Sequence, residues 1–399
     1  MKTKTPIRIH IVTFVALLSV SCVNVSEQRV SKIWTFVSIP DFLNVDTLYP
    51  EPKWEHALTY TLKSVKAENP DFVLVAGDEV MGHWDYPEKR LDNGETVEGE
   101  EGVRYWASVY YPAWKKRFEA HGLPVYTSIG DHEIGDNPWR LGSRRLRCVP
   151  EYKRMFAKYM EMPKNGPSHM KGTAFYVKHK NVLIVSVDVF EEGRSRQGGI
   201  AAQVTGKQLE WLDMTLRENT DVDHVIVMGH TPIVGPVRKR SSSGLMLEKG
   251  THSTFWQMMK KHKVDLYLCG EVHAITCHFK DGIQQIAHGG LYGYNPQVNY
   301  LVCTVHPDRI ELELKQIDIV NSGPKKWQVD SNRPRESVTM TAEVKKAGYQ
   351  TVGKATLTTT GNVNTQTKIS GLFDESNNPK RGKKLAQQSV AQRRGKPRE

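Results

Sequence analysis

Residues 266–275, LYLCGEVHAI, combine a buried strand with two residue types that bind metals. The first four residues form an apolar run that is typical of a strand in a protein core. Gly270 ends this run, and Glu271 and His273 follow it two residues apart. Carboxylate oxygens and imidazole nitrogens both bind divalent ions. The stretch therefore predicts a ligand-bearing loop at the point where a buried strand ends.

Similar apolar runs alternate with amphipathic stretches over most of the chain. The predicted strands cover residues 33–39, 72–77, 123–130, 182–188, 224–229 and 264–270. Helices are predicted over residues 54–68, 106–121 and 205–219. In the last of these, Leu209, Leu212 and Leu216 share one face. Strands that alternate with helices predict a layered α/β domain.

After Gly270 the helical pattern stops, and four strand-like runs follow. They cover residues 274–279, 283–290, 300–306 and 309–316. We expect these runs to form an antiparallel segment that closes the domain.

The composition changes along the chain predict four segments. These are an export signal at 1–22, a folded domain at 30–320, a Thr- and Lys-rich extension at 321–376 and a basic, disordered tail at 377–399. The extension contains KATLTTTG, which favours a hairpin at the edge of the domain. The tail nearly lacks apolar residues, so we expect it to remain unfolded, either as a solvated charge run or as a weak tether to acidic surfaces.

The net charge of +11 over 399 residues is concentrated at the two ends. The leader carries three positive charges and the tail a net of seven, so together they account for ten of the eleven. The folded middle is close to neutral. A specific nucleic-acid partner is therefore not indicated, although a surface that binds polyanions through the basic tail stays open.

The first 22 residues are typical of an export signal. Basic residues precede an apolar stretch at 11–18, which is too short to span a bilayer. The sequence LLSVSC then places small residues before Cys22, loosely like a bacterial lipoprotein cleavage site. The alternatives are a lipid on Cys22, which would be the membrane contact, and plain secretion. Both predict an extracytoplasmic protein that is periplasmic, secreted or lipid-anchored to a bacterial envelope.

The remaining cysteines do not form a disulfide scaffold. Cys148, Cys269, Cys277 and Cys303 are too few for a chain of this length. Cys277 and Cys303 lie in strand-like stretches, and both a disulfide between them and buried free thiols stay open.

Acids and histidines occur at the ends of five predicted strands. The motifs are VSIPD at 37–41, VAGD at 75–78, SIGDHE at 128–133, VMGH at 227–230 and LCGEVH at 268–273. Loops at the strand ends of an open α/β sheet converge on one crevice. Acids gathered there would repel one another unless cations bind between them. Two divalent ions that share a carboxylate would remove this repulsion and could catalyse phosphoryl transfer to water.

The order and spacing of these motifs over residues 32–316 resemble the calcineurin-like metallophosphoesterase superfamily. The resemblance implies a four-layer α/β/β/α sandwich of two mixed sheets flanked by helices. It also implies a hydrolase that cleaves a phosphate mono- or diester with metal-activated water at a di-metal centre. The substrate would be a small-molecule or glycan phosphate ester.

The resemblance assigns a role to each matching position. Asp41 and His273 match ligands of the first ion, Asp131 and His230 match ligands of the second, and Asp78 matches the bridging carboxylate. Asp131 stands where the family has a metal-binding asparagine. His132 matches the histidine that faces the leaving group, so His132 and Asp131 are the expected catalytic residues.

Two positions depart from the family pattern. Leu43 replaces the histidine two after Asp41, with Asn44 beside it as an additional candidate ligand. Glu271 replaces the first histidine of Gly-His-x-His and is expected to bind the second ion. The resulting oxygen-rich set favours Mn²⁺, Mg²⁺ or Ca²⁺ over Zn²⁺ or iron.

Four further residues are candidates for substrate binding, namely Arg238, Arg240, His288 and His83. His288 has the alternative of a hydrogen-bonded core histidine, and His83 that of packing.

The ligand residues and the function also have alternatives. Asp41 could be a helix cap, His132 a structural hydrogen-bond donor, and Glu271 the partner of an arginine in the 238–240 loop. The alternative function is a catalytically degenerate binding protein of the same fold, which Leu43 favours.

Overall fold

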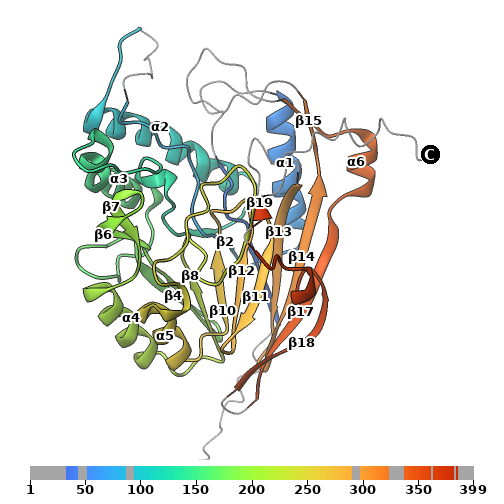
Figure 1. The fold of residues 1–399 in the computed structure, drawn as a ribbon. Coiled ribbons are helices and arrows are strands. Elements are labelled where there is room, and N and C mark those ends of the chain that lie inside the picture. Colours follow the sequence, from blue (N-terminus) through green and yellow to red (C-terminus); the bar gives the residue numbers. More distant parts are fainter. Residues whose placement is uncertain are drawn as a thin grey trace, which may run out of the picture. The chain divides into compact units, whose positions relative to one another are not determined.

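Two mixed β-sheets lie face to face and carry helices on their outer sides (Figure 1). The computed structural model describes residues 33–43, 52–86, 94–289, 297–322, 337–360, 363–381 and 383–384. The predicted export signal with Cys22, the candidate ligand Asn44 and the end of the basic tail lie outside these ranges.

The first sheet has seven strands in the order β18-β17-β14-β13-β1-β2-β3. Its members are β1 (Trp34–Ser38), β2 (Val73–Val75), β3 (Val125–Thr127), β13 (Gln297–Val305), β14 (Arg309–Asp318), β17 (Gln350–Thr360) and β18 (Val363–Gly371). β1, β2 and β3 are parallel, whereas β13, β14, β17 and β18 continue the sheet from β1 as antiparallel neighbours.

The second sheet has six strands in the order β11-β12-β10-β8-β5-β4. Its members are β4 (Phe175–His179), β5 (Val182–Ser186), β8 (His224–Met228), β10 (Leu266–Cys269), β11 (Thr276–Lys280) and β12 (Ile283–Ala287). The four central strands are parallel, and β4 and β11 pair antiparallel at the two edges.

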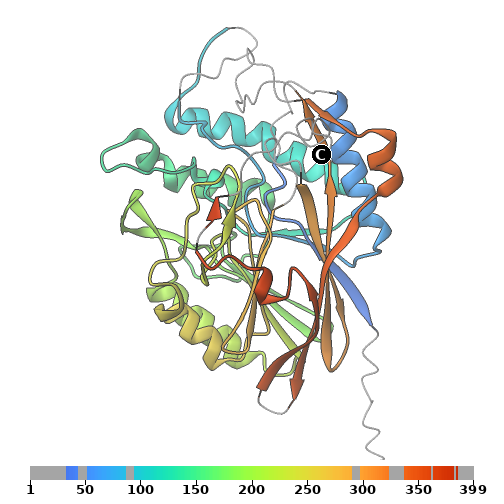
Figure 2. The same ribbon diagram turned by 45° about the vertical axis from the view of Figure 1, so that its right-hand side comes forward.

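Helices cover the outer faces of both sheets. They are α1 (Pro52–Ala67), α2 (Gly99–Glu119), α3 (Arg144–Met160), α4 (Gly206–Glu218), α5 (Thr254–Lys261) and α6 (Ala342–Ala347). α4 and α5 lie side by side in both views (Figures 1 and 2), and Asp213 on α4 pairs with Lys261 and with His262 just after α5. None of the described helices is long and apolar enough to cross a bilayer.

The core lies between the two sheets. Ser128, just after β3, and Ser186 at the end of β5 join the sheets through their hydroxyl groups, 2.9 Å apart. Nearby, the rings of Tyr126 and Phe175 pack with centroids 6.4 Å apart. The cysteines of the described residues are buried free thiols. The layered arrangement confirms the predicted α/β fold of two mixed sheets flanked by helices.

The last four predicted strands are present, but they do not form one closing segment. β11 and β12 pair with each other and join the six-stranded sheet, whereas β13 and β14 join the other sheet through β1. The sheet that each strand joins is set by the pairing of β12 with β10 and of β13 with β1. The local sequence pattern does not specify these pairings. The sequence did not predict α3, α5, β4 or the hairpin of β6 (Phe190–Ser195) and β7 (Gly198–Ala202).

The C-terminal segment is more ordered than its composition predicts. β17 and β18 form an edge hairpin on β14, and a 3₁₀ turn follows at Glu375–Asn377. β19 (Lys383–Lys384) then pairs in parallel with β9 (Arg238–Lys239). The prediction of disorder from residue 377 is therefore wrong for Lys383 and Lys384, whose backbones pair with β9 in spite of their basic side chains. The remaining short elements are β15 (Val320–Ser322), β16 (Ser337–Thr339), and 3₁₀ turns at His132–Ile134 and Gly250–His252.

Candidate metal centre

The carboxyl ends of five strands bring the predicted ligands together. The side chains that follow β1, β2, β3, β8 and β10 are Asp41, Asp78, Asp131, His230, Glu271 and His273, and all six are buried. Among the described residues they include two groups whose ligand atoms all lie within 4.8 Å of one another. One group is Asp41, Asp78 and His273, and the other is Asp78, Asp131 and His230. Asp78 belongs to both.

His230 shows how closely the second group is packed. Its Nε2 lies 3.4 Å from Asp78 Oδ1, 3.2 Å from Asp131 Oδ1 and 3.6 Å from Glu271 Oε2. Three carboxylates thus surround one imidazole nitrogen. An arrangement of this kind repels itself unless positive charge lies between the oxygens.

The backbone adopts unusual conformations to direct these side chains inward. The φ angles are 55° at Asp41, 62° at Asp78, 68° at Glu271 and 51° at His273, all in the left-handed region. Each such residue costs about 1 kcal/mol or more, and this kind of strain concentrates at functional sites. A Cβ at Gly130 would lie 2.3 Å from Asp78 Oδ1, so only glycine allows this approach.

Hydrogen bonds fix the orientation of the ligand groups. His230 Nδ1 donates to the Ala76 carbonyl at 2.7 Å, and His273 Nδ1 donates to the Arg240 carbonyl at 2.8 Å. In both rings Nε2 is then the nitrogen left to face the acids. A histidine whose other nitrogen is held by a carbonyl is the usual second-layer arrangement around a metal.

Several buried polar atoms of the site make no hydrogen bond and fit divalent cations. Asp41 Oδ2, Asp131 Oδ1 and His230 Nε2 are buried and make no hydrogen bond. Burial raises the pKa of Asp41 to about 8 and the pKa of Asp78 well above its usual range. Burial acts against protonation of His230, but Asp78 and Asp131 raise its pKa well above the usual value. Burying such polar groups without a compensating partner costs free energy. They are the types of donor atom that a di-metal centre needs.

Glu133 builds the frame of the centre, and sequence analysis did not single it out. Its buried carboxylate accepts backbone N–H groups from Asp78 and Gly130 at 2.8 Å, Glu79 at 2.9 Å and Val80 at 3.1 Å. These bonds tie the loop after β2 to the loop after β3. The signal was present in the motif GDHE, where an acid follows the candidate ligands directly.

Glu271 divides its two oxygens between a loop and the centre. Its Oε1 accepts hydrogen bonds from the Ser242 and Ser243 hydroxyls at 2.9 and 2.8 Å, and from the Gly244 and Leu245 amides at 2.8 and 2.9 Å. Its Oε2 points towards His230. Glu271 therefore orders the serine-rich loop after β9 and keeps one oxygen beside the second ligand group.

His132 lies at the opening of the centre, in a cavity of about 270 Å³. Its Nδ1 donates to the Met81 carbonyl at 2.8 Å, and its Nε2 lies 3.9 Å from Asp78 Oδ2. Burial acts to lower the pKa of His132, but Asp78, Asp136 and Asp131 outweigh it and raise the pKa to about 10. The metal-free site therefore favours the protonated ring, with the Nε2 proton on the side of the acids.

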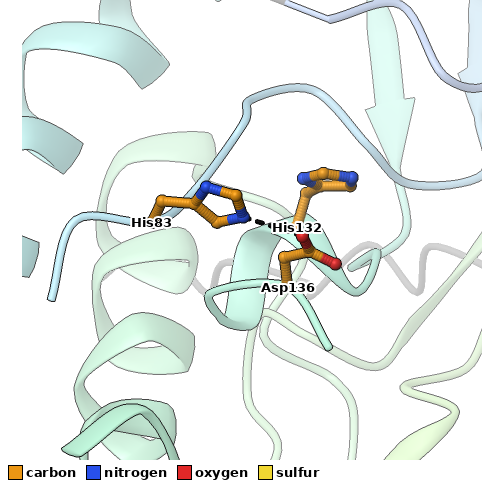
Figure 3. A group of neighbouring side chains, drawn as sticks. All are labelled: His83, His132 and Asp136. Atoms are coloured by element: carbon orange, nitrogen blue, oxygen red, sulfur yellow. Dashed lines mark hydrogen bonds and ion pairs between the residues drawn. The ribbon is translucent and has the colours of Figure 1, made fainter. Parts of the chain in front are cut away.

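His83 and Asp136 form a pair beside His132. His83 Nε2 lies 2.7 Å from Asp136 Oδ2, and the His83 and His132 rings stack with centroids 6.1 Å apart (Figure 3). Burial lowers the pKa of His83. Both residues of the pair line the cavity, and so does Asn137, whose amide donates to Asp131 Oδ2 at 2.9 Å. Asp136 and Asn137 were also missed by sequence analysis.

The other candidate substrate residues lie away from this cavity. His288 is fully buried between Ser38 Oγ at 3.0 Å and Asn299 Oδ1 at 3.1 Å, as a core histidine. Arg240 is buried and donates to Gln297 Oε1 at 3.4 Å. Arg238 lies on β9, beside β19. Of the four candidates, only His83 contributes to the cavity lining.

Leu43 is buried in the core, where the family pattern has a histidine. Within the described residues, the first ligand group therefore has three members, Asp41, Asp78 and His273. The second has the same number, with Glu271 Oε2 close by.

Comparisons with known proteins identify the family of the chain. The family model for calcineurin-like phosphoesterases matches residues 51–274, and no curated protein matches the chain. Solved structures similar to the chain include GAP50, the anchor in the inner membrane complex of Plasmodium, at 13% identity and a TM-score of 0.41, covering 79% of this chain and 92% of that one. A 5'-nucleotidase from Candida albicans is 14% identical with a TM-score of 0.38, covering 71% and 52%. A metallophosphoesterase from Sphaerobacter thermophilus is 11% identical with a TM-score of 0.26, covering 67% and 82%. On the match to the family model, which spans more than half of its residues, the chain belongs to the calcineurin-like phosphoesterase family.

Proposed function

We propose that the protein is an exported, metal-dependent phosphoesterase that hydrolyses a phosphate mono- or diester. The observation that carries this proposal is the position of Asp78, which belongs to both buried ligand groups. A carboxylate shared in this way is the element that holds two divalent ions close enough to act on one phosphate. The basic, apolar leader that ends near Cys22 supports the exported location.

The residues divide into two ligand sets. Asp41, Asp78 and His273 would hold one divalent ion, and Asp78, Asp131 and His230 the other, with Glu271 Oε2 as a further ligand. When bound, the two ions supply Lewis acidity and an activated water at neutral pH. The excess of carboxylate oxygens favours Mn²⁺, Mg²⁺ or Ca²⁺ over Zn²⁺ or iron.

His132 would protonate the leaving oxygen of the ester. The bond from its Nδ1 to the Met81 carbonyl fixes the ring, so the proton on Nε2 is the one directed to the cavity. In the metal-free protein the acids around His132 favour the protonated ring, as its raised pKa indicates. Asp131 contributes to this charge and is held in turn by Asn137.

Metal content and hydrolysis, measured together, test the proposal. Protein purified without chelator should carry about two divalent ions per chain by elemental mass spectrometry, and it should hydrolyse aryl phosphate mono- or diesters. Asp78→Asn should lose most of both the metal and the activity. Glu101→Asn, on the exposed face of α2, is the matched control.

The buried Leu43 supports a second candidate, a catalytically degenerate binding protein of this fold. One ion or none after metal is added back, together with no hydrolysis, would select this candidate. Two bound ions with turnover would exclude it.

A further inference from the structure

A second cavity of about 600 Å³ lies next to the metal centre. Its walls are the β6–β7 hairpin and the loop at residues 243–249, and the buried rings of Trp139 and Phe190 lie behind them. The hairpin is anchored by a hydrogen bond from the Gly199 amide to the Trp139 carbonyl at 2.8 Å. The Glu248 amide donates to the Ala202 carbonyl at 2.7 Å and ties the loop to β7. We call this cavity the basic annex.

Two contacts connect the annex to the metal centre. Ser243 lines both cavities. Its hydroxyl lies 2.8 Å from Glu271 Oε1 and 3.2 Å from Asn137 Nδ2, and its carbonyl accepts from Lys239 Nζ at 3.1 Å. In addition, the Phe190 ring lies with its centroid 6.1 Å from that of His230. Ser243 is therefore the wall that the two cavities share, and the annex lies directly beside the cavity of the metal centre.

The annex carries an excess of positive charge. Four cationic side chains line it, namely Arg194, Arg196, Lys239 and Lys249, against the single acid Glu248. Within the described part of the chain, none of the four cations forms an ion pair with a carboxylate. Uncompensated cations in a concave surface attract anions more strongly than isolated surface charges do.

We propose that the annex binds a second anionic group of the substrate. The substrate class is then a phosphate ester whose leaving group carries a further phosphate, sulfate or carboxylate. This inference rests on the proposed function, because it takes the metal centre as the site of the first phosphate. Arg194 and Arg196, on the hairpin and its turn, and Lys249, on the loop, are the specificity-determining residues.

The test compares substrates that differ by one anion. The probes are alkanediol bisphosphates and the matching hydroxyalkyl monophosphates, assayed by phosphate release from the metal-loaded protein. We expect kcat/KM to be about tenfold higher for the bisphosphate. In Arg194→Ser/Arg196→Ser the ratio of kcat/KM for the bisphosphate to kcat/KM for the monophosphate should fall. It should approach the value expected only from the two equivalent phosphates of the bisphosphate, with the monophosphate rate nearly unchanged. Lys164→Ser/Lys207→Ser removes two exposed charges outside the annex and should keep the ratio.

Calorimetric binding of non-hydrolysable phosphonates separates the annex from the chemistry. If the bisphosphonate binds more tightly than the monophosphonate in the wild type but not in Arg194→Ser/Arg196→Ser, the annex is supported even without turnover. Equal binding of the two probes by the wild type overturns the annex. If monophosphate hydrolysis persists in that case, the proposed function stands without it.

Discussion

Replacing Glu133 by glutamine should destabilise the protein and empty the metal centre. The carboxylate is buried and accepts four backbone N–H groups, two on each oxygen. Glutamine keeps the shape of the side chain but exchanges one acceptor oxygen for an NH₂ donor. Whichever way the amide turns, this donor faces two backbone N–H groups.

The magnitude follows from the number of donors left unpaired. A buried N–H without an acceptor costs about 1–3 kcal/mol, so two of them cost about 2–6 kcal/mol. Domain stabilities are about 5–15 kcal/mol, and the change is a large part of that. The loss also frees the loop that carries Asp78, so the metal content should fall with the stability.

Urea unfolding of metal-free protein measures the first effect, and elemental mass spectrometry of metal-loaded protein the second. The matched control is Glu101→Gln, which makes the same chemical change on an exposed face of α2. A free energy of unfolding within about 0.5 kcal/mol of the wild type would show that the four N–H groups do not depend on the carboxylate. Full metal content in a destabilised Glu133→Gln would show that Glu133 does not hold the metal centre together.

Three further predictions concern single residues. His132→Ala should lower turnover by about 10²–10⁴-fold with the metal content unchanged, and metal loss in this variant would show that His132 has a structural role. Glu271→Ala should remove one of the two ions. The control Ser242→Ala deletes only one of the four donors to Glu271 Oε1 and should keep both ions. An unchanged number of metal ions per chain in Glu271→Ala would mean that Glu271 only anchors the loop. His288 should make the free energy of unfolding depend on pH. Burial lowers the pKa of His288 to about 4 in the folded protein, whereas in the unfolded chain the ring takes up a proton near pH 6.5. Its contribution is complete above about pH 6.5 and is lost as the pH falls towards about 4, on the order of 3 kcal/mol in total. His288→Gln should lack this component of the urea midpoint, and equal pH slopes in both proteins would contradict the assignment.

Much of the fold could be predicted because its signals are local. Six predicted strands and three predicted helices correspond to β1, β2, β3, β5, β8, β10, α1, α2 and α4. Their apolar periodicity reflects burial on both faces of a strand or on one face of a helix. β6 and β7 were missed because the charged residues and the glycine of FEEGRS are equally typical of a polar loop.

The site divides in a similar way. Asp41, Asp78, Asp131, His230 and His273 could be placed at one rim, since each directly follows a buried strand and parallel strands end at the same edge. The buried position of Arg240 could not be predicted, because it depends on Gln297, which is distant in sequence. For His288 the sequence left two alternatives, a cavity residue and a hydrogen-bonded core histidine, and Ser38 and Asn299 hold it in the core.

The sequence by itself determined the strand–helix alternation and the residues at the strand ends, because both depend on short stretches of chain. The tertiary structure decided what surrounds those residues. It assigned β11 and β12 to one sheet and β13 and β14 to the other, and it paired Glu271 Oε1 with the loop at 242–245. These outcomes depend on hydrogen-bond partners and burial supplied by distant segments, so no local pattern contains them.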